Sequence, residues 1–383
     1  MKDISIYLSK LNDLGAFGKN SLGDTISFYN PELNLANFDI ALLGVEEERG
    51  TDEHSGCGSA PNKIRQQLFS LLHHFKNCNI VDLGNVKAGE TLQDTFYAVS
   101  EIVTELVKND CVVIILGGSQ DITYANYKAY ENLEQIVNLL SIDPKIDISS
   151  VGEGINDKNY INYIITHQPN YLFNYSNIGY QTYFVDSEML DLVKEMFFDA
   201  ERLGVVREKI LDAEPMLRSA DIVSLDVSSV RNSDLPGCKI PSPNGFYGEE
   251  ICQLARFAGL SDQLSSFGLY NYNPAFDFNN TGAMLCAQII WYFIDGVYHR
   301  EKDYPIANKD SYLKYIVSYE GMEDMIFYKS PKTSRWWMEA KVPKSGNSRY
   351  TKQLMIPCSY DDYLQACNGD VPERLISALK KVY

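Results

Sequence analysis

Two segments of the chain place acidic residues at spacings that could bind a cation. Asp143, Lys145 and Asp147 occupy alternate positions directly after an apolar run, and Asp226 closes another apolar run two residues before Ser228. Carboxylate oxygens are hard ligands that suit Mg²⁺ or Mn²⁺. Three aspartates placed together would resist folding unless a cation lay near them. We therefore predict that the three aspartates surround a cation, which the ammonium of Lys145 could supply.

Two further apolar runs end in polar residues that could belong to the same site. One is followed by a double-glycine turn and Gln120, whose amide carbonyl could add an oxygen ligand. The other continues through Asn271 to Asn273-Pro274 and Asp277. In a parallel α/β sheet, ligands bind outside the carboxyl ends of the strands. We therefore expect the ends of all four runs to face one site.

The elements that would position these residues follow a regular pattern. Short apolar runs alternate with amphipathic stretches, which is typical of βα units in a parallel sheet. The predicted buried strands cover residues 38–45, 111–116, 136–142, 221–225 and 264–269. Apolar residues at helical spacing predict helices over 64–75 and 92–106, and a long buried helix over 281–298. The predicted fold is therefore α/β, with three αβα layers around a mostly parallel central sheet.

The character of the sequence changes after about residue 300. Aromatic, partly alternating segments predict short antiparallel strands over 312–319, 324–328 and 335–339. A final helix is predicted where Asp370 is followed by Pro372 and Glu373.

The adjacent Trp336 and Trp337 would point to opposite sides of a strand, and we expect aromatic packing onto the main domain. The predicted organisation is an N-terminal segment (1–35), an α/β domain (36–302) and a small C-terminal α+β appendage (303–383) packed on that domain.

The four polar strand ends, taken in order, resemble the signatures of one enzyme superfamily. They are similar to G-G-D-H, D-A-H-x-D, S-x-D-x-D and E-x-N-P of the manganese-dependent amidinohydrolases, the arginase, agmatinase and formimidoylglutamase (ureohydrolase) superfamily. The sequence GSAPNKIR at 58–65 and VDLGNV at 81–86 resemble that family's first loop and second strand. The resemblance covers roughly residues 36–300 and implies an arginase-like fold for that part of the chain.

The resemblance also implies six metal-ligand positions, and three of them carry different residues here. Gln120 stands at the histidine of G-G-D-H, Lys145 at the histidine of D-A-H-x-D, and Ser228 at the last aspartate of S-x-D-x-D. The three aspartates described above are retained. Asn271 stands where the family has a substrate-orienting glutamate. The resemblance thus implies a degenerate dinuclear manganese site.

Three functions are compatible with this pattern. A dinuclear hydrolase needs both ions to generate a bridging hydroxide, which favours a non-catalytic relative, or pseudoenzyme, that binds or scaffolds and needs no cofactor. The alternative is an amidinohydrolase-type C–N hydrolase of formimidoylglutamase, agmatinase or arginase type with an altered site. Its three aspartates and the Gln120 carbonyl would hold at most one Mn or Mg ion. An ordinary dinuclear amidine hydrolase is the third.

Two further residues are candidates for the substrate pocket beside Asn271. Glu250 matches a glutamate of the family's helix after the S-x-D-x-D strand, and it could lie at the pocket rim or simply favour the helix N-terminus. His54 lies in the predicted loop after the first strand, where it could reach the pocket or remain a solvated loop residue.

Composition narrows the partners and the compartment. The formal net charge of -17 disfavours binding to nucleic acid and to anionic membranes, so we expect a small molecule or another protein as partner. The eight cysteines form no C-x-x-C pair and are predicted to be reduced core residues. We see no signal peptide and no membrane span, which predicts a cytoplasmic protein. The family resemblance also implies that a homo-oligomer is possible.

Overall fold

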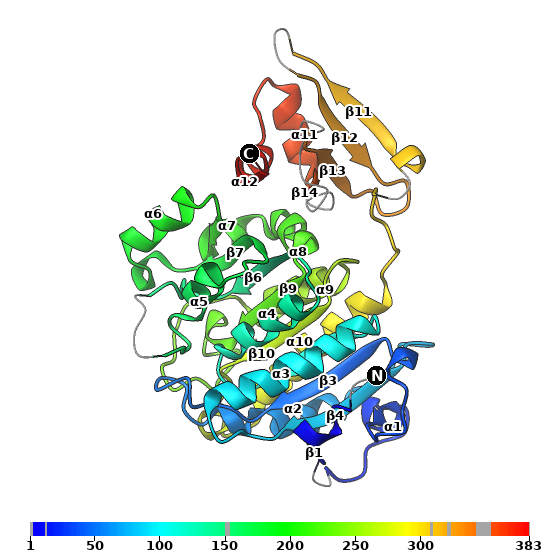
Figure 1. Cartoon of the computed structure of the whole chain (residues 1–383), viewed down its shortest axis with the longest axis vertical. Helices are drawn as coiled ribbons and strands as arrows, with labels where there is room; N and C mark the ends of the chain where they lie inside the picture. Colours follow the sequence, from blue (N-terminus) through cyan, green and yellow to red (C-terminus); the bar gives the residue numbers. More distant parts are fainter. Residues whose placement is uncertain are drawn as a thin grey trace.

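The protein is built around a ten-stranded, mostly parallel sheet (Figure 1). A computed structural model describes residues 3–11, 14–149, 154–306, 309–319, 323–341 and 354–382. The sheet contains β1 (Leu8–Ser9), β2 (Ser27–Phe28), β3 (Ile40–Val45), β4 (Ile80–Val86), β5 (Val112–Leu116), β6 (Val137–Ile142), β7 (Leu172–Tyr180), β8 (Asp199–Arg202), β9 (Ile222–Asp226) and β10 (Ser266–Tyr270). Their order is β1-β4-β3-β5-β10-β9-β6-β7-β8, and β2 also pairs with β4.

Helices cover both faces of this sheet and enclose two apolar cores (Figure 1). They are α1 (Leu22–Thr25), α2 (Ala60–Leu68), α3 (Leu92–Lys108), α4 (Ile122–Asn132), α5 (Tyr160–Thr166), α6 (Ser187–Glu195), α7 (Leu203–Glu208), α8 (Glu214–Ser219), α9 (Gly248–Gly259) and α10 (Thr281–Tyr298). The core on one face includes residues of α2, α9 and α10, and the other includes residues of α3, α4 and α5. The predicted three-layer α/β class is therefore confirmed.

All five predicted strands are present, with ends shifted by one or two residues. They are buried along almost their whole length because both faces of a parallel sheet are covered by helices. The strands β7 and β8 were not predicted from apolar runs, because β7 contains polar residues such as Asn174, Ser176 and Asn177.

Two of the three predicted helices are confirmed. The helix α3 begins in a capping box in which Thr91 and Asp94 exchange hydrogen bonds, and α10 has the predicted bounds of 281–298. The predicted helix over 64–75 is wrong at its end, because α2 stops at Leu68. The backbone N–H groups of Leu22 and Gly23 donate to the carbonyls of Leu71 and Phe69, so the chain there pairs with the N-terminal segment instead.

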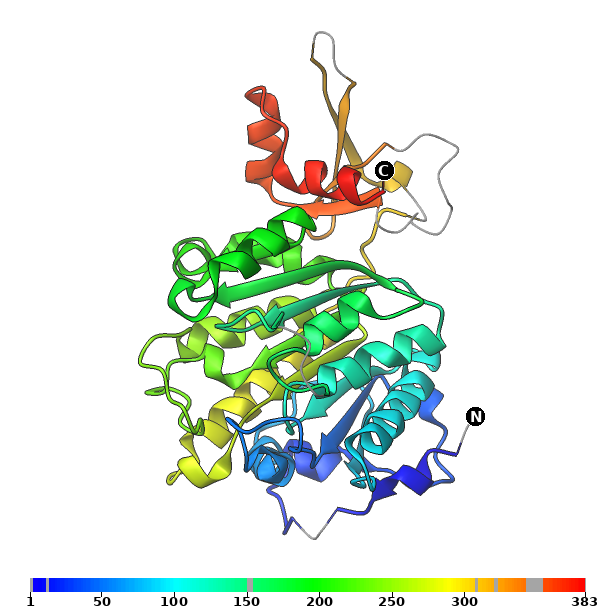
Figure 2. The ribbon, with the colours of Figure 1, turned by 60° about the vertical axis from the view of Figure 1, so that its left-hand side comes forward.

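The C-terminal appendage forms a second, four-stranded antiparallel sheet at one end of the molecule (Figure 2). It contains β11 (Leu313–Val317), β12 (Met325–Lys329), β13 (Trp336–Glu339), β14 (Met355–Cys358), α11 (Tyr360–Cys367) and α12 (Glu373–Val382). The two tryptophans lie on opposite sides of β13, as predicted. Trp336 belongs to the small core of the appendage, whereas Trp337 faces Arg218 of the main domain.

Arg218 makes several buried polar contacts between the main domain and the appendage, and Arg335 and Arg374 of the appendage add contacts to Glu214 and to the carbonyl of Asp212. Its Nη1 and Nη2 atoms donate to the carbonyls of Trp336 and Cys358 at 3.0 and 3.1 Å, and its Nε atom donates to Glu214 at 3.2 Å. The guanidinium lies 4.5 Å from the centre of the Trp337 ring. The appendage is thus docked by an arginine from helix α8.

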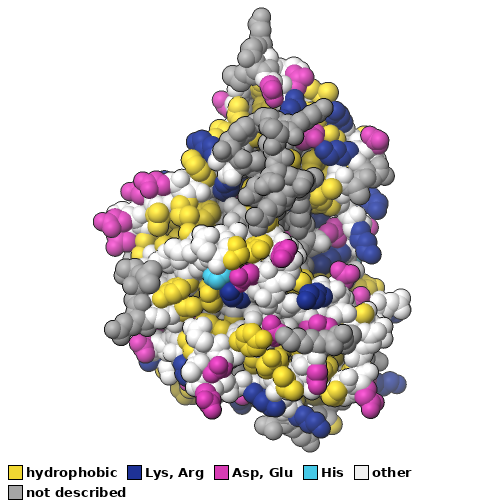
Figure 3. Space-filling view, in the orientation of Figure 1, with side chains coloured by type: hydrophobic (Ala, Val, Ile, Leu, Met, Phe, Trp, Pro, Cys, Tyr) yellow, Lys and Arg dark blue, Asp and Glu magenta, His cyan; other side chains and the backbone are white. Residues whose placement is uncertain are grey.

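Seven cysteines are buried or partly buried and all eight are free, but Cys367 is exposed, so the prediction of eight core cysteines is wrong at that residue. It lies in the last turn of α11, where only one helix face meets the core. Within the described residues, no helix has the length and apolar character of a membrane span. Acidic and basic side chains are interspersed on the face shown in Figure 3.

Candidate functional site

The four predicted polar segments follow β5, β6, β9 and β10, which are neighbours in the sheet. Because these strands are parallel, their carboxyl ends meet at one edge. The turn after β5 needs glycine, since Gly118 has a φ of 76° and a Cβ there would lie 2.8 Å from the carbonyl oxygen of Glu47. This turn allows Gln120 to face β9 and β10, where its Nε2 atom lies 3.3 Å from Ser224 Oγ.

The three aspartates lie close enough at this edge for their charges to interact, and we call them the acidic site. Asp143 and Asp226 end the neighbouring strands β6 and β9, and both are almost completely buried. The backbone N–H groups of Lys145 and Ser228 donate to Asp143 Oδ1 and Asp226 Oδ1, each at 2.7 Å. Asp143 Oδ2 is buried and has no hydrogen-bond partner among the described residues.

Burial and mutual repulsion make these carboxyl groups weak acids. Burial, followed by the charge of Asp226, raises the pKa of Asp143 to about 7. Burial, followed by the charges of Asp143, Asp157 and Asp226, raises the pKa of Asp147 well above its usual range. The acidic site therefore retains protons near neutral pH unless another cation takes their place.

Asn271 connects the acidic site to the turn after β5. Its side chain accepts a hydrogen bond from the backbone N–H of Gln120 at 3.1 Å and donates to Asp226 Oδ2 at 2.9 Å. Its backbone φ of 67° lies in the left-handed region, which asparagine adopts more readily than most residues. Asn271 thus positions Asp226 instead of contributing a negative charge.

Lys145 does not make its ion pair with the three aspartates, contrary to the sequence prediction. Its Nζ atom donates to Glu53 Oε2 at 2.9 Å, and Lys158 Nζ lies 2.7 Å from the other oxygen of Glu53. The Lys145 side chain is 38% exposed, so water also solvates it. Asp147 and Asp226 act on Lys145 only through longer-range attraction. Lys145 pairs with Glu53 because Glu53, although remote in sequence, is close in space and partly exposed. Water therefore solvates this pair better than it would solvate a pair with the buried aspartates.

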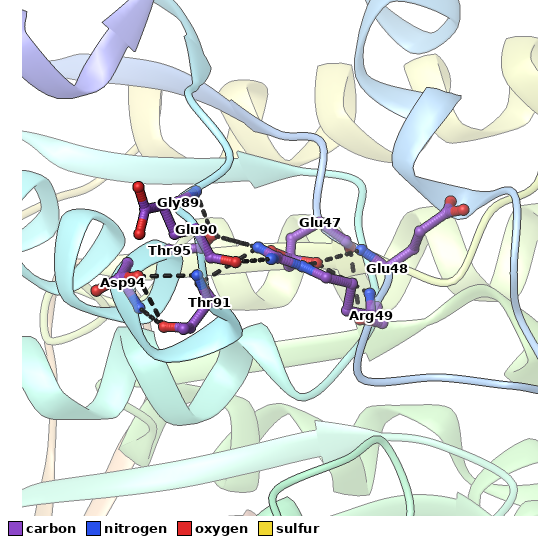
Figure 4. A network of polar contacts seen from close by, with 9 residues as sticks. Glu47, Glu48, Arg49, Gly89, Glu90, Thr91, Asp94 and Thr95 are labelled. Atoms are coloured by element: carbon purple, nitrogen blue, oxygen red, sulfur yellow. Dashed lines mark hydrogen bonds and ion pairs between the residues drawn. The ribbon is translucent and has the colours of Figure 1, made fainter.

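A loop of residues 46–58 between β3 and α2 lies beside the acidic site, where its Glu53 pairs with Lys145, and we call it the cap loop. Figure 4 shows how its first residues are fixed to the start of α3. Glu47 accepts hydrogen bonds from Arg49 Nε at 2.9 Å and from Thr95 Oγ1 at 2.9 Å, and Arg49 also donates to the carbonyl of Glu90. Glu48 accepts from the backbone of Gly56 and Gly58, which closes the loop on itself.

Further contacts tie the middle of the cap loop to the strand ends. Thr51 Oγ1 donates to Asp157 Oδ2 at 2.5 Å, and the backbone N–H of Asp157 donates to the carbonyl of Gly50. Asn273 Nδ2 donates to the carbonyl of Ser55 at 2.6 Å. The Glu53 bonds described above are a third attachment. The cap loop is therefore fixed to the strand ends at the site.

Several residues of the site were missed in the sequence. Asp157 adds a further carboxyl group, and its pKa is raised first by burial. Burial likewise raises the pKa of Asp121 to about 7, and both of its oxygens lack a hydrogen-bond partner among the described residues. Asp121 directly follows Gln120 and could have been noticed there, whereas Asp157 and Glu53 lie in loops without any motif.

The two remaining pocket candidates occupy different places. His54 belongs to the cap loop and is buried at 6% exposure, so the alternative of a solvated loop histidine is wrong. Its backbone N–H donates to Thr51 Oγ1 at 3.0 Å, which turns the residue inward. Glu250 lies in the first turn of α9 and accepts from Arg207 Nε at 3.0 Å and from the Tyr247 backbone at 2.8 Å. These two partners belong to α7 and to the residue directly before α9.

The residues present do not fit a dinuclear metal centre. Gln120, Lys145 and Ser228 offer at most neutral oxygen atoms where the resemblance requires histidine or carboxylate, and the Lys145 ammonium cannot ligate. In the described parts of the chain, no group of three or more His, Cys, Asp or Glu side chains stands ready to share one ion. Asp143 Oδ2, which is buried and has no hydrogen-bond partner among the described residues, could contact a single cation.

Comparisons with known proteins point to one family. A model of the protein family described as Arginase family matches residues 38–295. The chain is 24% identical over 270 residues to a formimidoylglutamase of Photorhabdus laumondii, covering 66% of this chain and 84% of that protein. It is 23% identical over 295 residues to a formimidoylglutamase of Staphylococcus haemolyticus, covering 70% and 91%.

Solved structures show the same fold. Formimidoylglutamase from Bacillus subtilis superimposes with a TM-score of 0.67 at 18% identity, covering 76% of this chain and 95% of the other. Formiminoglutamase from Trypanosoma cruzi, solved with Mn²⁺, gives a TM-score of 0.67 at 17% identity, covering 73% and 99%. These matches confirm the predicted arginase-like fold.

Proposed function

This chain belongs to the arginase family, and we propose that it acts on a linear amidine as a C–N hydrolase of the formimidoylglutamase type, with an altered site that takes at most one divalent ion. The similar proteins that carry a curated activity name support this class of reaction. The substituted ligand positions are the reason to limit the site to one ion.

The observation that carries the proposal is Asp143 Oδ2, a buried oxygen that has no hydrogen-bond partner among the described residues and lies beside two other buried carboxyl groups. Lys145 makes its ion pair with Glu53, so it reaches the acidic site only through longer-range attraction. A protonated amidine is a planar cation with N–H donors, and such donors pair well with carboxylate oxygens. The site is therefore suited to a cationic ligand that enters from solution.

The chain's own residues could support hydrolysis near neutral pH. The pKa of Asp143, raised to about 7 by burial and by Asp226, would let it take a proton from water and return one to a leaving amine. Asn271 would keep Asp226 in place, and the cap loop would exclude bulk water. A divalent ion, when bound, would supply Lewis-acid chemistry.

A second candidate is a non-catalytic protein that binds an amidine or another small molecule without turning it over. The substitutions at Gln120, Lys145 and Ser228 favour it, because the dinuclear set that the family's chemistry requires does not fit here. The two candidates share the acidic site and differ only in turnover.

One experiment separates them. The purified protein is incubated with Mn²⁺ or Mg²⁺ and N-formimidoyl-L-glutamate, arginine or agmatine, while formamide and urea are measured. We expect release of formamide that disappears in Asp143→Asn, with no more than one metal ion per chain. Asp191→Asn, an exposed aspartate of α6, is the matched control. The absence of release from all three compounds, together with ligand-induced stabilisation that Asp143→Asn abolishes, would establish the second candidate.

A reversal variant tests the limit of one ion. Gln120→His, Lys145→His and Ser228→Asp together rebuild the family's ligand types. We expect the metal content of the triple variant to rise from at most one ion per chain towards two, as measured by elemental analysis after dialysis. Two ions in the unaltered protein would contradict the proposal.

A further inference from the structure

We propose that strand β11 of the appendage pairs with the same strand of a second copy of the chain. The two strands run antiparallel about a twofold axis at Tyr315, so the two four-stranded sheets join into one continuous sheet. The inference concerns the appendage alone and does not rest on the proposed function of the acidic site.

The strand β11 is an open margin of the appendage sheet. It ends the strand order β11-β12-β13-β14, and within the described residues only β12 pairs with it. It lies on the outer side of the appendage (Figure 1). The opposite margin, β14, faces the main domain, where Arg218 Nη2 donates to the carbonyl of Cys358 at 3.1 Å. A strand at an open margin keeps backbone N–H and C=O groups that can pair with a strand of another molecule.

The side chains of β11 do little to protect this margin. Leu313 and Ile316 are 53% and 56% exposed, and Lys314 is the one charged residue of the strand. The strand has no proline, which would interrupt pairing by removing a backbone N–H group. Edge strands of proteins that stay monomeric are usually guarded by charges, by proline or by very short length. Exposed aliphatic side chains on an open five-residue strand therefore indicate a surface that meets a partner.

One face of β11 continues into an aromatic surface of α11. Successive residues of a strand point to opposite faces, so Leu313, Tyr315 and Val317 share one face. On this face the ring centres of Tyr315 and Tyr363 of α11 lie 5.4 Å apart. Tyr360, which is 52% exposed, stacks on Tyr363. The apolar surface that a partner can contact thus extends from the strand onto the helix.

Pairing about Tyr315 makes β11 complementary to its own copy, which is why we choose a second copy as the partner. In this register Leu313 lies opposite Val317 of the second copy, and the two Tyr315 side chains lie opposite each other. On the other face Lys314 lies opposite Ile316 of the second copy, so the two lysines do not face each other. Aromatic and β-branched side chains paired across strands stabilise a sheet, whereas like charges directly opposite each other destabilise it.

The distribution of charge along the chain also favours contact between copies at the appendage. Residues 303–383 contain 12 Lys and Arg against 10 Asp and Glu, a formal charge of +2, so the residues before them carry -19 of the total of -17. Two copies that met through their acidic main domains would repel each other. The appendage is the part of the chain where a second copy can approach without that repulsion.

The experiment measures the mass of the full chain in solution by light scattering over a range of concentrations. We expect a monomer–dimer equilibrium whose dissociation constant rises at least about tenfold in Ile316→Lys, because the substitution places two lysines opposite each other at two positions of the joint. Adding Lys314→Glu to Ile316→Lys should restore the dimer, since opposite charges then face each other. Ile240→Lys is the matched control, because Ile240 is 58% exposed and lies outside the appendage.

Each outcome supports or overturns the inference. A monomer at every concentration, a mass above that of two chains, or equal weakening by Ile316→Lys and Ile240→Lys would overturn it. A dimer that Ile316→Lys weakens but Lys314→Glu does not restore would overturn the register about Tyr315. Thermal melts should show an unchanged fold in all variants, since the substituted side chains are exposed. Asp143→Asn should dimerise as the unaltered protein does, so the result is independent of turnover at the acidic site.

Discussion

Arg218, at the contact with the appendage, and Asp143, at the acidic site, are both buried charged residues, but they have very different partners. The Nε, Nη1 and Nη2 atoms of Arg218 each donate a hydrogen bond, and its guanidinium stacks on Trp337. Asp143 has one oxygen without a hydrogen-bond partner in the part of the chain that the structure describes, and two other carboxyl groups lie nearby.

The difference distinguishes a structural charge from one that is open to a ligand. A buried charge with all its hydrogen bonds made stabilises one arrangement of two elements, and losing it leaves those partners unpaired. A buried charge without partners lowers the free energy of unfolding. Such groups concentrate where binding or catalysis occurs. Three substitutions test whether this contrast between the two regions is correct.

The largest effect is expected for Arg218→Met. This substitution leaves two buried backbone carbonyls without their donors, although Glu214 keeps its ion pair with Arg335, and it should lower the free energy of unfolding by about 3–5 kcal/mol. Urea denaturation measures the loss, and proteolysis near residue 303 should accelerate as the appendage undocks. Lys209→Met is the control, since Lys209 and its partner Asp361 are both 64% exposed and should contribute almost nothing. Equal effects of the two substitutions would show that Arg218 is not the docking residue.

The next effect concerns Asp143→Asn and has the opposite sign. Burial raises the pKa of Asp143 from 3.8 to about 7, so the folded state favours the protonated form. The contribution of Asp143 to the free energy of unfolding is fully present below about pH 4, and it is lost as the pH rises through 7. The substitution removes that loss, and the variant should be about 2–4 kcal/mol more stable than the unaltered protein at pH 8 after chelation.

Denaturation curves at pH 5 and pH 8 check this prediction. The gain should be clearly larger at pH 8 than at pH 5, and Asp191→Asn should show no such difference because Asp191 is exposed. A variant that is less stable than the unaltered protein at pH 8 would mean that Asp143 already has a cationic partner.

The smallest effect is expected for Lys145→Met. Because Lys145 is 38% exposed and pairs with a partly exposed Glu53, its loss should cost less than about 1 kcal/mol. Lys158→Met, which removes the other partner of Glu53, should behave similarly and serves as the matched comparison. A loss of 3–5 kcal/mol in chelator would place the Lys145 ammonium among the aspartates after all. Thermal melts of both variants decide the point.

Much of the fold could be predicted because the sheet is parallel and covered on both sides. Its central strands are continuous apolar runs, such as Val112–Leu116, and α3 carries a clear capping signal at Thr91. Strands without that pattern were missed: β8 is four residues long and reads DAER, and β14 contains Pro357. The end of α2 was also missed, since apolar residues beyond Leu68 contact the N-terminal segment rather than extending the helix.

From the sequence, only those residues of the candidate site that directly follow a strand could be predicted. Residues that follow neighbouring parallel strands must lie near one another, which brings Asp143 beside Asp226. The direction of a long side chain is not determined this way. Lys145 turns towards Glu53, and Glu53 belongs to a loop whose course depends on distant contacts such as Thr51 with Asp157. The sequence contains no local signal for either contact.

The two margins of the large sheet have a consequence for how the protein behaves at high concentration. An exposed strand edge can pair with a strand of another molecule and begin aggregation. Here β8 ends the sheet after only four residues, three of them charged, and the opposite margin at β4 is paired with the two-residue strands β1 and β2. Neither margin offers a long, flat template. Intermolecular extension of this sheet is therefore disfavoured, and the buried apolar strands between the margins stay protected from misassembly.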